Sequence, residues 1–328
     1  MENRGMSYDI YNTAEKRKDF NLENIQLLKD FLDYCESKGM SPESIKQYKN
    51  RLECFFVYLL LEKNNKSFID LTKKDIILWQ GSRIKLGKSS SNIRQSRASM
   101  SSLGNYIESI EEENYPNYRN IIGKIPAPPN EQKRDKTYLS EDQIILIENE
   151  LLRREEYQKL VLISLLYDSA SRKSELWQTL KEVDYTNRET KLVIGKGKKI
   201  FTLPFSKKTA EYIKLYLEKR GEDNSPFMFI SKNKNGDVKQ ISKSSISSYC
   251  KYFSEILKEL TSEDVNIYPH SFRCSRLSNI YHDKHLPVET VQKYAHHSNA
   301  STTINSYIED RQGDTNKSVF KEDNEMEE

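Results

Sequence analysis

The sequence predicts a mainly α-helical protein of two domains, with one small β-hairpin inside the second domain. Through most of the chain apolar residues recur at spacings of three and four, as in amphipathic helices. A strand-like pattern occurs only in residues 191–205. The helical periodicity breaks at residues 125–136, IPAPPNEQKRDK, where three prolines and a charge cluster are typical of a linker. With 328 residues, the chain also exceeds the roughly 100–200 residues of a typical domain.

Five segments follow from these patterns. We expect an N-terminal extension (1–19), a helical domain (20–115), a linker (116–136), a second domain (137–320) and an acidic, disordered tail (321–328).

The helical domain is expected to contain four helices. Residues 22–38 carry apolar side chains at helical spacing. The pair Ser41 and Pro42 supplies an N-cap and a first-turn proline for the second helix. Thr72 opens a capping box before the third helix, and the fourth begins at about Ser91. Four short helices of this kind predict one compact unit.

The second domain is expected to open with a helix capped by Ser140. The next helix, YQKLVLISLLYD, is almost wholly apolar and must be buried on most sides. The segment SASRKSELWQTL is a small-residue turn that leads into a helix with Arg172 and Glu175 near its start. Two short strands, KLVIG and IFTLPF, flank a lysine-rich turn. Further helices are expected over about 206–219, 242–259, 270–284 and 287–295.

Composition excludes several classes of protein. No apolar run approaches the roughly 18–20 residues of a membrane span, and the first 20 residues lack the apolar core of a signal peptide. We therefore expect a soluble, cytoplasmic protein. The four cysteines lack metal-ligand spacing, which argues against a zinc site and a disulfide framework. The net charge is +3, and residues 321–328 contribute −4, so the preceding 320 residues carry +7. That surplus suits a polyanionic partner.

Several residues in the second domain suit the cutting and rejoining of a phosphodiester without a metal ion. Arg172 and Arg273 are candidate cations, because a guanidinium binds two phosphate oxygens at once. Lys196, on the hairpin, can deliver a proton to a leaving oxygen. Tyr307 can attack phosphorus and retain it covalently, with a histidine assisting. No Walker A sequence, HExxH helix or cluster of acids for two metal ions competes with this interpretation.

In their order along the chain, these residues resemble the active site of the tyrosine recombinases, also called phage integrases. The matching elements are Arg172 in SRKSEL, Lys196 in GKGKK, His270 and Arg273 in HSFR, His297 in HHSNASTT, and Tyr307. The match covers nearly the whole chain, and five elements in order are much more specific than any one alone. The resemblance implies a two-domain clamp around DNA, with a core-binding domain at 20–115 and a catalytic domain at 137–320.

The resemblance implies how the phosphate would be held. Arg172 and Arg273 would bind the non-bridging oxygens, and His297 would donate a further hydrogen bond. Glu175 would be a supporting residue that orients the site. Where the family commonly has a glycine this chain has His296, so the sequence leaves open which histidine of the pair faces the phosphate.

The resemblance also implies the chemical steps. Tyr307 would form the 3′-phosphotyrosyl link, with His270 assisting its proton transfer. Lys196 would protonate the leaving 5′ oxygen, although a slip in strand register would place Lys198 there instead. No cofactor is expected, because the cations are side chains and the covalent link stores the bond energy. The implied partners are double-stranded DNA with specific sites and a homotetramer on paired sites, and accessory DNA-bending proteins can take part.

Some alternatives stay open at the sequence level. Arg94 and Arg97 lie away from the apolar stripe of their helix, where they would either bind DNA phosphates or form a solvated face. The chain could also be a non-catalytic DNA-binding accessory protein of the same fold, or a relaxase similar to type IB topoisomerases. The abundance of Lys, Asn and Ile is typical of an AT-rich prokaryote, virus or mobile element.

Overall fold

The computed structural model describes residues 12–129, 136–233, 235–297 and 299–308. It confirms the predicted fold class, since helices dominate and the strands form small antiparallel pairs. The chain divides into two compact units, 1–134 and 135–328, and each has its own hydrophobic core. Within the described ranges, no helix combines the length and apolar character needed to cross a membrane.

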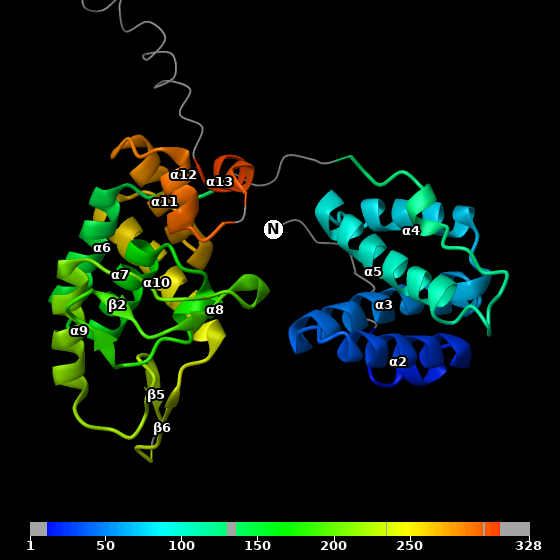
Figure 1. The fold of residues 1–328 in the computed structure, drawn as a ribbon, viewed down its shortest axis with the longest axis horizontal. Coiled ribbons are helices and arrows are strands. Elements are labelled where there is room, and N and C mark those ends of the chain that lie inside the picture. The colour runs from blue at the N-terminus through cyan, green and yellow to red at the C-terminus, as the bar shows by residue number, and fades with distance from the viewer. Residues whose placement is uncertain (1–11, 130–135, 234, 298, 309–328) are drawn as a thin grey trace, which may run out of the picture. The chain divides into compact units, whose positions relative to one another are not determined.

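Four α-helices are described in the first unit (Figure 1). They are α2 (Leu22–Ser37), α3 (Pro42–Glu62), α4 (Lys73–Lys85) and α5 (Ser90–Ser109). The caps form where the sequence places them, because Ser41 and Thr72 each accept a backbone N–H of the first turn that would otherwise lack a partner. The apolar stripes meet in a core centred on residues such as Phe55, Trp79 and Met100.

Residues 116–129, expected as part of a linker, pack on the first unit. Ile122 and Ile125 are buried in its core, and a 3-10 helix spans Ile122–Lys124. The carbonyls of both isoleucines accept hydrogen bonds from the Arg97 guanidinium. Asn120 also donates to the Ser101 carbonyl at 3.1 Å. Buried apolar side chains and satisfied carbonyls fix this segment despite its prolines.

Part of the expected N-terminal extension also packs on the first unit. A 3-10 helix covers Lys16–Asp19, and Phe20 is buried edge-on against Phe56. The Asn12 amide donates to the Glu53 carboxylate at 3.1 Å. Residues 1–11 and the predicted acidic tail lie outside the described residues.

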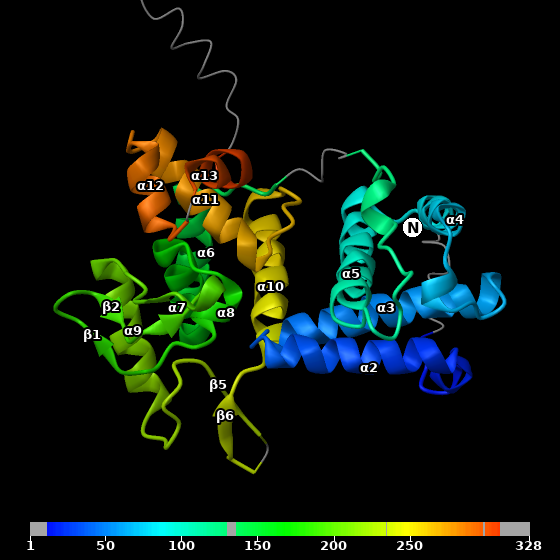
Figure 2. The same cartoon turned by 45° about the vertical axis from the view of Figure 1, so that its right-hand side comes forward.

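Eight helices of the second unit are described. They are α6 (Glu141–Arg153), α7 (Tyr157–Ser169), α8 (Lys173–Leu176), α9 (Lys207–Arg220), α10 (Lys243–Thr261), α11 (Pro269–His282), α12 (Val288–Tyr294) and α13 (Ala300–Tyr307). The apolar α7 is central and packs against α6, α9 and α11, which explains why it lacks a polar face. In both views α11, α12 and α13 lie together at one end of this unit (Figures 1 and 2).

Among the described residues of this unit, three antiparallel strand pairs interrupt the helices. The pairs are β1 (Val183–Asp184) with β2 (Glu189–Thr190), β3 (Val193–Ile194) with β4 (Ile200–Phe201), and β5 (Ile230–Lys232) with β6 (Val238–Gln240). The sequence predicted only the middle pair. Strands of two or three residues carry too little alternation to be recognised from sequence.

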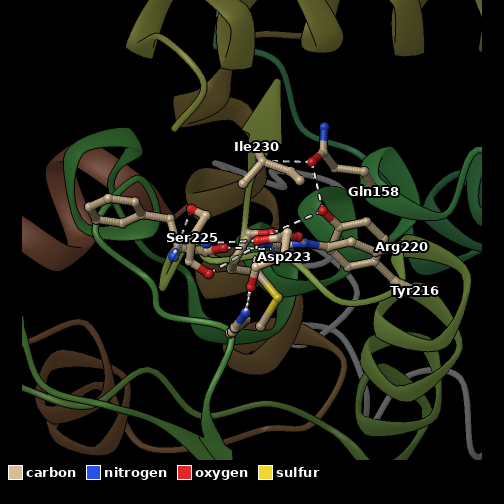
Figure 3. Close-up of polar contacts among 9 residues, drawn as sticks. Gln158, Tyr216, Arg220, Asp223, Ser225 and Ile230 are labelled. Atoms are coloured by element: carbon tan, nitrogen blue, oxygen red, sulfur yellow. Dashed lines mark hydrogen bonds and ion pairs between the residues drawn. The ribbon is translucent and has the colours of Figure 1, made fainter. Parts of the chain in front are cut away.

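A buried ion pair fixes the loop between α9 and β5 (Figure 3). Arg220, at the end of α9, donates two hydrogen bonds to the Asp223 carboxylate at 2.5 and 2.7 Å. The neighbouring Tyr216 hydroxyl donates to the Gln158 side-chain oxygen at 2.7 Å, and the same oxygen accepts the Ile230 N–H at 2.9 Å. These contacts fasten the β5 and β6 pair to α7.

Candidate active site

Arg172 and Glu175 are joined at the start of α8. The chain leaves α7 through Ala170 in the left-handed conformation (φ 47°), and Arg172 then becomes the N-cap of α8. Glu175 is almost completely buried, with 1% of its side chain exposed. Its carboxylate accepts the Arg172 backbone N–H at 2.7 Å and the Arg172 guanidinium at 2.8 Å. Two contacts to one carboxylate hold the partly exposed Arg172 in a defined direction.

Arg273 lies in the interior, on α11, with 1% exposed surface. Its guanidinium donates to the carbonyls of Ala170 and Ala295, the latter at 2.6 Å. The same Nη2 approaches Nε2 of His297 at 2.7 Å. Its Nε atom is buried and has no hydrogen-bond partner among the described residues. Burial, followed by the charge of Arg172, lowers the pKa of Arg273. The structure thus holds a desolvated cation that is only partly satisfied.

His297 connects Arg273 to the helix that carries Tyr307. Because a guanidinium only donates, Nε2 of His297 accepts the bond from Arg273 and Nδ1 carries the proton. Nδ1 then donates to Thr303 Oγ1 at 2.9 Å, and Thr303 is fully buried on α13. Burial, with the charges of Arg273 and Arg172, lowers the pKa of His297 to about 4. The imidazole is therefore neutral at neutral pH.

Tyr307 is the last residue of α13, and its ring is enclosed by three predicted site residues. Its ring centroid lies 4.6 Å from that of His297 and 5.0 Å from that of His270. The Arg273 guanidinium carbon is 5.0 Å from the same centroid. Only 7% of Tyr307 is exposed, and its apolar neighbours include Cys274. Cys274, the residue after Arg273, thus packs in the same core cluster as the tyrosine.

His270 occupies the second position of α11 and keeps an exposed edge. Burial of the rest of its ring, with the charges of Arg273 and Arg172, lowers its pKa to about 4. His270 is thus a neutral base beside the Tyr307 ring. A neutral imidazole can accept a proton, which is what activation of a tyrosine requires.

The hairpin of β3 and β4 carries Lys196 to the same region. A surface pocket of about 330 Å³ is lined by Arg172, Lys196, Gly197, Lys199, Phe201, His296 and His297. Lys198 is not among the lining residues. Gly197 and Lys198 both have positive φ, so the turn reverses direction directly after Lys196. The pocket therefore joins three predicted site residues from three separate segments.

The two adjacent histidines have different neighbours. His297 contacts Arg273 and Tyr307, whereas His296 stacks on Phe201 of β4, with centroids 3.9 Å apart and planes at 22°. Burial lowers the pKa of His296 as well. His297 thus lies with the other predicted site residues, whereas His296 has a separate contact on the hairpin, and which of the two faces a phosphate stays a prediction.

Arg94 and Arg97 lie on α5 of the first unit, in contrasting environments. Arg97 is 6% exposed, and its guanidinium donates to the Gln80 side chain and to two backbone carbonyls. Arg94 is exposed, and its Nε donates to the Pro128 carbonyl at 2.8 Å. The Arg97 guanidinium already donates hydrogen bonds within the protein, whereas Arg94 faces solvent. A DNA contact by either residue stays a prediction.

Sequence reasoning missed two residues that shape the site. Thr303 lies one helical turn before Tyr307 on α13, so the two residues share one face of that helix. A helix over 300–307 was not predicted, because eight residues carry too little periodicity. Phe201 was included in a predicted strand, but its contact with His296 joins segments 95 residues apart. No local signal reports such a contact.

The model of the phage integrase family matches residues 137–313 of this sequence. The chain belongs to the phage integrase family. The SPbeta prophage-derived recombinase-like protein YomM of Bacillus subtilis (strain 168) is 30% identical over 299 residues, which cover 87% of each chain. Tyrosine recombinase XerA of Pyrococcus horikoshii is 28% identical over 286 residues, covering 85% of this chain and 88% of the relative. This integrase-family chain is accordingly a tyrosine-type site-specific DNA recombinase.

Solved structures share its fold at low identity. The Tn1549 transposon integrase in complex with transposon right end DNA is 15% identical, with a TM-score of 0.66 over 90% of this chain and 98% of that one. A lambda integrase dimer bound to a COC′ core site is 16% identical, with a TM-score of 0.63 over 87% and 77% of the two chains. Lambda integrase has also been solved as a tetramer bound to a Holliday junction.

Proposed function

We propose that this chain recombines specific DNA sites through a 3′-phosphotyrosyl intermediate at Tyr307. One observation carries the proposal: the Tyr307 ring lies among Arg273, His270 and His297, and His297 also lines the pocket shared by Arg172 and Lys196. Six residues that are dispersed over 136 positions thus form two groups that share His297, one at the pocket and one around the Tyr307 ring. Convergence of this kind is what transfer of a phosphate between a tyrosine and DNA requires.

Two arginines would hold the phosphate. Arg172 is directed by buried Glu175, and Arg273 presents a buried cation with one unsatisfied nitrogen, so an anion would find both charge and donors. On phosphate binding, the Arg273 bond to His297 would be exchanged for a phosphate oxygen. His297 would then donate through Nε2 and accept at Nδ1 from Thr303, because a threonine hydroxyl can either donate or accept.

The reaction balances with the side chains of the chain alone. The Tyr307 oxygen forms a bond to phosphorus as the bond to the 5′ oxygen breaks. His270, neutral at the outset, takes the tyrosine proton, and Lys196 gives a proton to the leaving oxygen. Attack by a 5′ hydroxyl reverses each step and restores the tyrosine. Neither a metal ion nor ATP enters this sequence of steps.

The proposal includes the first unit and the assembly. Residues 20–115 would bind DNA together with the catalytic domain, and exposed Arg94 would contact a phosphate. Four copies would act on paired sites, as the lambda integrase tetramer on a Holliday junction suggests for a protein of this fold. The enzyme would act in the cytoplasm, where its DNA lies.

A trapping experiment tests the proposal. The protein is incubated with nicked fragments from the flanks of its own gene, because a nick lets the short product diffuse away and leaves the covalent complex. A shifted band on a denaturing gel should map to Tyr307 and disappear in Tyr307→Phe. Lys196→Ala should reduce trapping, whereas Lys198→Ala, its matched control on the same turn, should not.

Binding without an adduct on a fragment that contains the site would favour the non-catalytic DNA-binding alternative. An adduct accompanied by relaxation of supercoiled DNA, but never by recombinant joints, would favour the relaxase alternative. The mechanism predicts that cleavage continues in EDTA. If cleavage stopped in EDTA and required added Mg²⁺, that result would contradict the mechanism.

A further inference from the structure

His296 occupies a backbone position that favours glycine. Helix α12 ends at Tyr294, and the N–H groups of His296 and His297 bond back to the carbonyls of Lys293 and Gln292 at 3.0 and 3.1 Å. This pattern is a Schellman motif, whose left-handed residue is usually glycine. His296 takes that position with φ 52°. A side chain in the left-handed region is disfavoured unless the surroundings compensate for it.

The compensating contact is with the hairpin that carries Lys196. The His296 imidazole stacks on the Phe201 ring at a centroid distance of 3.9 Å. Phe201 belongs to β4 and pairs with Val193 of β3, so it lies at the base of the turn that contains Lys196. Two-residue strands provide little rigidity of their own. The turn therefore depends on contacts from outside the hairpin.

The Phe201 ring contacts both His296 and Gly195, the residue before Lys196. A Cβ atom built on Gly195 would lie 2.5 Å from the Phe201 ring and 3.1 Å from the Glu175 carboxylate. Gly195 is thus pressed between the ring and the group that directs Arg172. If the ring moved, the backbone at Gly195 would be free to shift, and Lys196 would shift with it.

We propose that His296 is a positioning residue, whose ring presses Phe201 against Gly195 and so holds Lys196 at the phosphate pocket. The inference rests on the proposed role of Lys196 as the proton donor to the leaving 5′ oxygen. In this role the imidazole acts as a flat ring and not as an acid, a base or a phosphate ligand. His296, the first histidine of the pair, therefore serves the hairpin, and the turn that follows α12 connects the two sides of the pocket.

The test compares two leaving groups at the cleavage site mapped by trapping. One suicide substrate carries the ordinary 5′ oxygen, and the other carries sulfur at that bridging position. A thiolate leaves without a proton, so the sulfur substrate bypasses the general acid. His296→Gly relieves the backbone and removes the ring. We expect it to slow cleavage of the oxygen substrate by about tenfold or more, within the range of general-acid catalysis, and to leave the sulfur substrate within about twofold of the unmodified enzyme.

Matched variants separate the ring from other roles. His296→Asn tolerates the left-handed region but cannot stack, so it should behave as His296→Gly does. His296→Phe keeps the stacked ring and should restore most of the lost rate. Phe201→Leu should show the same oxygen-specific loss. Combining Lys196→Ala with His296→Gly should add nothing to the loss of Lys196→Ala, because both act on one proton. Thermal melts identify any variant that loses its fold.

The outcomes separate the positioning role of His296 from the role of Lys196 as the acid. Equal losses on both substrates in His296→Gly, with an oxygen-specific loss in Lys196→Ala, would overturn the positioning role alone and make His296 a phosphate ligand. An unchanged rate for both His296→Gly and His296→Asn would overturn it also. Equal losses on both substrates in Lys196→Ala would show that Lys196 is not the acid, and the positioning role would fall with it.

Discussion

Arg97 in the first unit and Arg273 in the second are both buried, and the two arginines have contrasting surroundings. Arg97 in the first unit donates to the Gln80 side chain and to the carbonyls of Ile122 and Ile125. Arg273 in the second unit also donates to two carbonyls, but its third contact is a neutral histidine and its Nε has no partner among the described residues.

The difference shows that burial alone does not identify a functional arginine. Burial lowers the pKa of both guanidinium groups, and a second arginine, Arg94 or Arg172, adds to the effect in each case. What separates them is the remaining capacity to bind. Arg97 is surrounded by protein acceptors that belong to its own fold, so it fastens a chain segment. Arg273 lies near Arg172, neutral rings and the single carboxylate of Glu175, and an incoming phosphate would add negative charge to this group.

The largest effect should follow from removing Arg273. Arg273→Met should lower the rate of cleavage by roughly 10²–10³-fold or more, because the transition-state charge loses a fixed donor. DNA binding, measured by filter retention, should change little. Arg276→Met, one turn further along α11, is the matched control, since the contacts of Arg276 are with Tyr167 and Glu141. If Arg273→Met cleaved DNA at a near-normal rate, Arg273 would have only a structural role, as Arg97 does.

Removing Arg97 should act on stability instead. Arg97→Met would leave the carbonyls of Ile122 and Ile125 without this donor inside the core, which costs about 2–4 kcal/mol of unfolding free energy. Denaturant unfolding of the variant should show this loss, while cleavage below its melting temperature should stay close to normal. Arg94→Met is the control for stability. A variant that melts normally but loses DNA binding would instead support a direct contact by Arg97.

The pH dependence of stability should distinguish the second unit. His270 and His297 have pKa values of about 4 in the free protein, below the roughly 6.5 of an unfolded chain. Between these values the unfolded state binds more protons, so the stability of the second unit should fall as pH drops from about 6.5 towards 4. NMR titration of the imidazoles should locate both pKa values.

Arg273→Met should raise the pKa of His297, because a neighbouring positive charge is lost. An unchanged pKa would contradict the electrostatic coupling between Arg273 and His297.

The smallest effect should come from Arg94. Replacing it with alanine should weaken DNA binding modestly and reduce the slope of log affinity against log salt by about one, as expected for a single phosphate contact. Binding isotherms at several salt concentrations give the slope. If the slope were unchanged, the exposed arginine of α5 would have only its Pro128 contact, and the first unit would bind DNA through other residues.

The fold was largely predictable because its signals are local. Spacing of apolar residues and the caps at Ser41, Thr72 and Ser140 define helices within a few residues of their ends. The β1/β2 pair, the β5/β6 pair and α13 escaped because two to eight residues carry little periodicity. The attachment of residues 116–125 to the first unit also escaped, since the donor that fixes it, Arg97, lies on another helix.

For the candidate site, the sequence by itself determined the inventory: two arginines, a lysine, two histidines and a tyrosine in a recognisable order, with family membership as the consequence. The tertiary structure decided which groups meet. Only folding brings His297 to Arg273, buries Glu175 beneath Arg172 and stacks His296 on Phe201. The reason is physical, because residue type and local propensity are written in neighbouring positions, whereas burial, tautomer and pKa depend on atoms contributed by distant segments.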